Sequence, residues 1–402
     1  MKRHAASVAL AIALISVLVP AAAAQDADSI VLAYRRNFAR ASLVTKLELV
    51  KEAAASQGGA MGPLYDMAIR FAYENAALLG ADPQLKDLAL VASNEAGKAG
   101  YAKSIDNLWS LFQAYRDPDV RASAVRALGL AGTGESRVSE YLGAFLASQN
   151  SLFRSGAQPE YPALEACIEA LGLLGDGASF PVLFSAYIAG YSPALATKAA
   201  LALGKIKGDY EAYLLQVIAR NPPLEKAAAF AAGMENPSFA DRQRGELAEG
   251  AMSAALDAYE EPQARSPVEL QALREMRLGA ARQFKALKWQ RASALAIRHF
   301  RLVQADYAKG AAAKSELLEA VACLGAMGST EAAQTLALHL QLINAQTEQG
   351  APYDEPLVLA VIAALGELGD KAAFDYLLQM GYLQYTDTVK RAAREALLKL
   401  KW

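Results

Sequence analysis

The fold of this chain is decided by a short glycine-containing stretch, Ala170-Leu171-Gly172-Leu173-Leu174-Gly175-Asp176. Its two glycines are followed, eight residues after the second one, by Leu183. The same spacing recurs as Gly97, Gly100 and Leu108, as Gly325, Gly328 and Leu336, and as Gly366, Gly369 and Leu377. Identical spacing at separate places indicates that one structural unit is repeated along the chain.

The residues beside the glycines predict that each unit is a pair of helices. After Asp117-Pro118, the residues Val120, Ala124 and Ala127 fall at three- and four-residue steps, which is typical of one buried helix face. We expect the first glycine of each pair to lie where two helices approach closely, and the second to take the left-handed conformation that ends a helix. One hairpin cannot bury its apolar face alone. Neighbouring hairpins are therefore expected to stack into an all-α fold, an α-solenoid.

These motifs are similar to those of a known family. The stretch Asp117-Pro118-Asp119-Val120-Arg121, with Ala124, Ala127-Leu128-Gly129 and Gly132, resembles the HEAT repeat in the variant called phycobilisome-lyase-like HEAT repeats. Ala364-Leu365-Gly366-Glu367-Leu368-Gly369-Asp370 resembles the same motif. The resemblance implies a superhelix of helical hairpins that binds proteins. A minority of the family act as bilin lyases or attach to larger enzymes.

The amino terminus indicates export. Lys2 and Arg3 precede an apolar run, and Ala22-Ala23-Ala24 suits a cleavage site, so residues 1–24 are expected to form a signal peptide. An uncleaved anchor is the alternative. The remaining residues, 25–402, are expected to form an α-solenoid of about eight HEAT-like repeats, degenerate and basic at 221–312. We expect an exported protein, located in the periplasm, with no transmembrane segment after cleavage.

The net charge bears on which partners the chain could bind, and the two cysteines bear on whether it forms a disulfide. Removal of Lys2 and Arg3 changes the formal net charge from -2 to -4, so nothing favours binding to nucleic acid. Cys167 and Cys323 lie in different repeats, and distant repeats of a solenoid do not touch. Both are expected to be buried free thiols, although an exported protein permits a disulfide.

Residues that carry catalysis are scarce. After residue 24 the only histidines are His299 and His339, which show no zinc-type spacing to cysteines or carboxylates. No catalytic triad, cofactor motif or metal site is indicated, so we predict no catalytic, cofactor-binding or metal-binding residues. The chain is expected not to be an enzyme. The resemblance also raises bilin-lyase activity, but the sequence shows no pair of catalytic residues that would support it.

Two regions are candidates for partner binding. One is the basic stretch, residues 265–301, from which we select Arg274, Arg277, Lys288, Trp289, Arg291, Arg298 and Arg301. Alternatively, the acidic residues of the preceding segment, from Glu246 to Glu261, neutralise it within the fold. The other region is formed by two similar insertions, 156–162 and 350–356, in which Tyr161 and Tyr353 mark a shared edge. Alternatively, each tyrosine fixes its own loop onto the next helix.

These observations together predict a non-enzymatic exported scaffold. We expect it to bind a protein partner of the cell envelope through its superhelical surface. The alternative is a module that binds an anionic envelope polymer or a lipid headgroup through the basic stretch. The sequence does not predict an oligomeric state.

Overall fold

The computed structural model describes residues 28–261 and 264–401, and these residues form helices without any β-strand. The predicted all-α class is therefore confirmed. The chain divides into two compact units, Met1–Gly208 and Asp209–Trp402, and each is described by itself. The predicted signal peptide, residues 1–24, lies outside the described residues. Among the described residues, no helix combines the length and the apolar character needed to cross a membrane.

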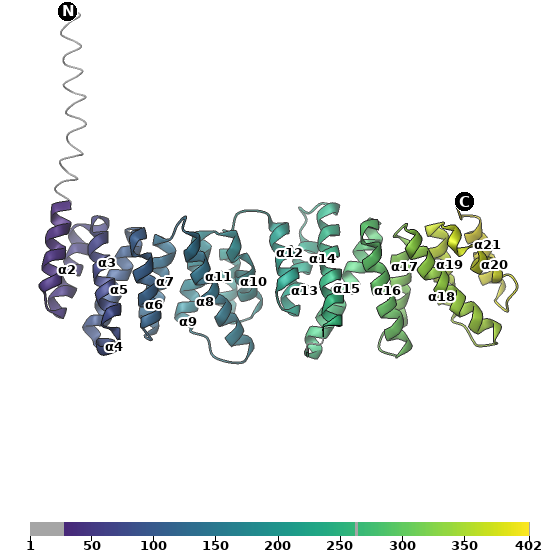
Figure 1. The fold of residues 1–402 in the computed structure, drawn as a ribbon, viewed down its shortest axis with the longest axis horizontal. Helices are drawn as coiled ribbons and strands as arrows, with labels where there is room; N and C mark the ends of the chain where they lie inside the picture. The colour runs from purple at the N-terminus through teal and green to yellow at the C-terminus, as the bar shows by residue number, and fades with distance from the viewer. Residues whose placement is uncertain (1–27, 262–263, 402) are drawn as a thin grey trace, which may run out of the picture. The chain divides into compact units, whose positions relative to one another are not determined.

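The first unit consists of neighbouring helices that pack in sequence order (Figure 1). Residues 28–40 form its first described helix. The helices that follow are α2 (Leu43–Ser56), α3 (Gly62–Glu74), α4 (Ala76–Leu79), α5 (Pro83–Lys98), α6 (Ile105–Ala114), α7 (Pro118–Ala131), α8 (Ser136–Arg154), α9 (Tyr161–Leu174), α10 (Phe180–Ile188) and α11 (Pro193–Leu203). Helices α3, α5, α7, α9 and α11 form one row in which each packs on the next, and α6, α8 and α10 pack beside that row.

The second unit repeats this arrangement (Figure 1). Its helices are α12 (Tyr210–Arg220), α13 (Pro223–Glu235), α14 (Asp241–Glu260), α15 (Pro267–Leu287), α16 (Ser293–Ala308), α17 (Lys314–Gly325), α18 (Thr330–Glu348), α19 (Glu355–Leu368), α20 (Phe374–Gln379) and α21 (Asp387–Leu397). Helices α13, α15, α17, α19 and α21 form the corresponding row, in which each packs on the next.

The first glycine of the predicted pairs lies at a close contact between two helices of a row. A Cβ atom built on Gly172 of α9 would lie 2.8 Å from the Cα atom of Ala202 on α11. A Cβ atom on Gly366 of α19 would lie 3.3 Å from the Cβ atom of Ala396 on α21. Gly97 and Gly325 make similar contacts with α7 and α19. The predicted close approach is confirmed, and it accounts for glycine at a helical position that otherwise favours alanine.

The second glycine ends the helix, as predicted. Gly175 and Gly369 both have φ of 64°, in the left-handed region, and their N–H groups donate to the carbonyl oxygens of Leu171 and Leu365. Asp176 then caps the short helix that follows. One helix stops and the next begins within a few residues, which produces the hairpin.

Buried polar side chains tie the hairpins together in the same way in both units. In the first unit, Asn150 on α8 accepts a hydrogen bond from the hydroxyl of Tyr191 (2.8 Å). In the second unit, Asn344 on α18 accepts one from Tyr385 (2.9 Å). A spacing of 194 residues separates both the two asparagines and the two tyrosines, and the same spacing separates Gly172 from Gly366. Helices α8 to α11 and α18 to α21 are therefore equivalent copies.

Candidate functional site

The basic stretch, residues 265–301, runs from the loop before α15 into α16, and α14 supplies acidic partners for its second half. Arg298 donates to Asp257 (3.0 Å) and Glu260 (2.7 Å). The hydrogen bond that Arg298 donates to Glu260, and then the one to Asp257, raise the pKa of Arg298. Arg291 pairs with Glu249 (2.8 Å). Carboxylates of α14 thus neutralise Arg291, which precedes α16, and Arg298, which lies within it.

Trp289 belongs to the same network. Its indole N–H donates to Glu249 (3.0 Å), and the Arg291 guanidinium lies 5.0 Å from its ring centre. The ring packs against Gly245 of α14, where a Cβ atom would lie 2.6 Å from it. Trp289 therefore holds the turn between α15 and α16 against α14.

The first half of the stretch pairs with α17 instead. The Nε atom of Arg274 lies 3.1 Å from Glu316, and this hydrogen-bonded pairing raises the pKa of Arg274. Arg282 makes two hydrogen bonds to Glu319, at 3.0 and 3.1 Å. The carboxylates that pair with the arginines thus lie on α14 and on α17, about one hairpin before and one hairpin after them in the sequence.

Arg277 occupies a different environment from its neighbours. Its side chain is 1% exposed, so it does not form part of the surface. The guanidinium lies 5.1 Å from the ring centre of Tyr259, and its Nε and Nη1 atoms have no hydrogen-bond partner among the described residues. Burial lowers its pKa. Lys288 and Arg301 are exposed and make no ion pair within the described part of the chain.

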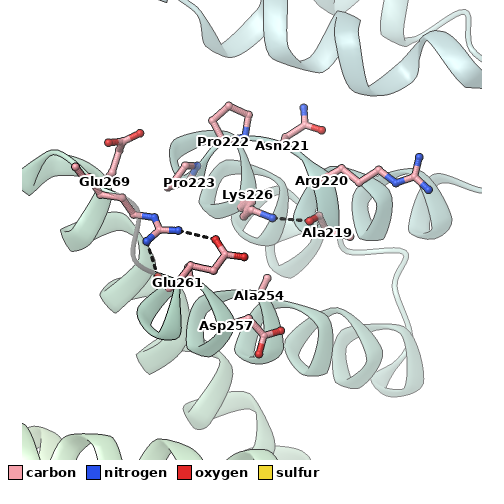
Figure 2. Close-up of a pocket in the computed structure, with 13 residues that line it drawn as sticks. Ala219, Arg220, Asn221, Pro222, Pro223, Lys226, Ala254, Asp257, Glu261 and Glu269 are labelled. Atoms are coloured by element: carbon pink, nitrogen blue, oxygen red, sulfur yellow. Dashed lines mark hydrogen bonds and ion pairs between the residues drawn. The ribbon is translucent and has the colours of Figure 1, made fainter.

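A pocket of about 540 Å³ adjoins the start of the basic stretch (Figure 2). Lys226 of α13 donates to the carbonyl oxygens of Ile218 (2.6 Å) and Ala219 (2.7 Å) at the end of α12. Arg265 pairs with Glu261 (3.0 Å) at the end of α14. Both cations therefore stabilise helix C-termini. The charged lining residues balance, with the cations Arg220, Lys226 and Arg265 against the carboxylates Asp257, Glu261 and Glu269.

Tyr161 lies at the start of α9, in a groove of about 260 Å³ on the first unit. Its side chain is 39% exposed, and the groove is also lined by prolines and by the exposed Arg116. Arg121 also lines this groove. It pairs with Glu160 (2.7 Å) and donates to the carbonyl oxygen of Phe112 (2.6 Å), which fixes the loop before α9 onto the end of α6.

Tyr353 has a different environment. Its hydroxyl accepts a hydrogen bond from the backbone N–H of Thr386 (3.0 Å), and its ring packs edge-on against Tyr385, with ring centres 4.7 Å apart. Position by position, Tyr161 corresponds to Glu355 in the second copy. The structure therefore places the two tyrosines at non-equivalent positions. Tyr353 fixes its loop, whereas Tyr161 leaves its ring accessible.

Of the cysteines and histidines that the structure describes, Cys167, Cys323 and His299 are buried and His339 is half-buried. Cys167 and Cys323 are free buried thiols, and burial raises the pKa of Cys323 to about 12. His299 is buried, and burial together with the charge of Arg277 lowers its pKa to about 3. His339 accepts or donates one hydrogen bond with Gln304 (2.9 Å). Within residues 28–261 and 264–401, no cluster of histidines, cysteines and carboxylates could hold a metal ion.

Lys46 is a further candidate functional residue, outside the two regions predicted from the sequence. This residue lies on the buried face of α2 together with Leu47, Val50 and Ala53, where a lysine is unusual. A lysine inside an apolar stripe was the available signal.

Comparison with known proteins adds no assignment, because no protein-family model matches this chain and no curated protein is significantly similar to it.

Proposed function

We propose that this chain is an exported, non-enzymatic scaffold that binds a protein partner of the cell envelope. In this proposal its hairpins form an α-solenoid of HEAT-like repeats, preceded by a signal peptide at residues 1–24. The observation that carries the proposal is the recurrent glycine–alanine contact between successive helices of a row, found in both units. Stacked hairpins of this kind present long, continuous surfaces, which are suited to binding other proteins.

The groove around Tyr161 is the contact site that we favour. Arg116 beside Tyr161 has no ion-pair partner among the described residues, and tyrosine and arginine are both enriched at the energetic centres of protein interfaces. Leu173, at the other end of α9, is 53% exposed and extends the accessible apolar surface of this helix. The equivalent positions in α19 carry Glu355 and Glu367. At these two positions α9 of the first unit is therefore more apolar than α19 of the second unit.

The alternative function, binding of an anionic polymer or lipid headgroup through residues 265–301, has less support. Arg274, Arg291 and Arg298 are each engaged by carboxylates of the fold. Among the described residues of the stretch, the exposed cations without such partners are Lys285, Lys288 and Arg301, and three separate charges supply only a weak, salt-sensitive attraction.

Affinity capture from an envelope extract tests the proposal. The chain lacking residues 1–24 is compared with a variant carrying Tyr161→Glu and Leu173→Glu, which copies the α19 residues into α9. A protein retained by the wild type and lost by this variant is the expected result. The matched control carries Lys288→Glu and Arg301→Glu, which breaks no ion pair and should retain the protein. Loss in the control alone, or capture of only lipid or polysaccharide, would contradict the proposal.

A further inference from the structure

A second groove, of about 390 Å³, lies in the first unit between helix 28–40 and α3, with α2 at its base. The residues that α3 contributes, from Pro63 to Glu74, recur at three- and four-residue steps along the whole helix. Its apolar wall is formed by Phe38, Met67 and Phe71. Phe38 and Phe71 pack edge-on, with ring centres 6.1 Å apart. An apolar groove with a few charged groups is the usual form of a small-molecule site.

The charges in this groove do not balance. Glu74 is neutralised by Arg70, at 2.8 Å. Burial raises the pKa of Asp66, and this shift is opposed by the hydrogen bond that Asp66 accepts from Asn107 (2.7 Å) and by the positive charges of Arg35 and Arg70. Each of the two carboxylates thus has a cationic neighbour within the groove. Lys46 is the one cation lining the groove that is not matched by a carboxylate lining it.

Lys46 is 6% exposed, and its ammonium group lies between the two aromatic rings, 5.1 Å from the centre of Phe38 and 4.9 Å from that of Phe71. One of its three N–H groups donates to the carbonyl oxygen of Ala41, which caps helix 28–40. Within the described part of the chain, no carboxylate lies at ion-pair distance from it. A buried ammonium without a counter-ion is costly, since its lost hydration is only partly replaced.

We propose that this groove binds an amphipathic monoanion whose carboxylate pairs with Lys46 and whose apolar body lies against Phe38, Met67 and Phe71. A single negative charge balances the three cations and two carboxylates that line the groove. The apolar wall provides the burial that favours a hydrocarbon chain over a bare inorganic anion. This site is separate from the Tyr161 groove and does not depend on the protein-binding proposal.

Calorimetric titration of the full chain with three ligands of equal chain length tests the charge preference. Decanoate should bind at least about tenfold more tightly than decanol, a difference of about 1.4 kcal/mol, because only decanoate supplies the counter-charge. Decylammonium should bind more weakly than decanol. Equal affinity for decanoate and decanol, or tighter binding of decylammonium, would overturn the proposal.

Two variants locate the site. Lys46→Met should abolish the preference for decanoate over decanol, and Met67→Trp, which fills the groove, should abolish binding of both ligands. The matched control is Lys226→Met, because Lys226 also caps a helix end, from a half-buried position, but has Asp257 and Glu261 nearby. Decanoate affinity should not change in this control. Unchanged binding in Met67→Trp, or equal loss in Lys226→Met, would refute the assignment even if Lys46→Met did not fold.

Discussion

His299 is expected to make the second unit sensitive to mild acid. The side chain is 0% exposed, and both ring nitrogens lack hydrogen-bond partners among the described residues. Burial, and secondarily the charge of Arg277, lowers its pKa to about 3 from an ordinary value of 6.5. The folded state therefore keeps the ring neutral at a pH at which the unfolded chain takes up a proton.

The sign and size of the effect follow from proton linkage. Because the pKa is lowered by folding, the stabilisation is complete above pH 6.5 and is lost as the pH falls toward 3. Between pH 7 and pH 5 the loss is about 2 kcal/mol, with a limit of about 5 kcal/mol below pH 3. Over the first interval the folded ring stays neutral, so the result depends only on protonation of the unfolded chain. Most carboxylates do not titrate in this interval.

Urea unfolding at pH 7, 6 and 5 measures the effect. In a Trp109→Phe background the remaining tryptophans, Trp289 and Trp402, both belong to the second unit, so fluorescence reports that unit. The free energy of unfolding should fall by about 2 kcal/mol more in the parent than in the same chain with His299→Leu. His339 is unchanged in both chains, so its contribution cancels. Equal pH dependence in the two chains would refute the argument.

Two further predictions concern packing and the loop before α9. Gly172→Val should cost about 3 kcal/mol and Gly366→Val about 1 kcal/mol, because the new side chain meets backbone at 2.8 Å in the first case and a methyl group at 3.3 Å in the second. Urea unfolding checks the order, and equal costs would contradict it. Arg121→Met should cost about 2 kcal/mol, because it removes the contacts that Arg121 makes with Glu160 and with backbone carbonyl oxygens. An unchanged midpoint by circular dichroism would show that these contacts do not stabilise the loop.

The helical hairpins could be predicted because their requirements are local. A left-handed helix end at Gly175 or Gly369 strongly favours glycine, and a close helix contact at Gly172 needs a residue without a side chain. Each requirement is satisfied by one residue at one position. The spacing of the glycines therefore predicts the helical hairpin directly.

The pairing of the basic stretch could not be decided from sequence because it depends on which helices face each other. Arg274 pairs with a glutamate 42 residues away, and Arg298 with an aspartate 41 residues away, on opposite sides of the stretch. The sequence marks the acidic residues that precede the stretch as its partners, whereas Glu316 and Glu319 lie after it and carry no such mark. In both ion pairs the partners are separated in sequence by about one repeat length, because equivalent faces of neighbouring hairpins meet in the fold.

The equivalent helices α9 and α19 share a buried face and differ on the exposed one. Tyr161 and Leu173 correspond to Glu355 and Glu367, so packing does not require an apolar residue at either position. Both side chains are therefore free to serve the contact with a protein partner that we propose for this helix. The pair of substitutions Tyr161→Glu and Leu173→Glu should therefore change the free energy of unfolding by no more than about 0.5 kcal/mol while abolishing partner retention. A loss of several kcal/mol in urea unfolding would instead show that both side chains stabilise the first unit.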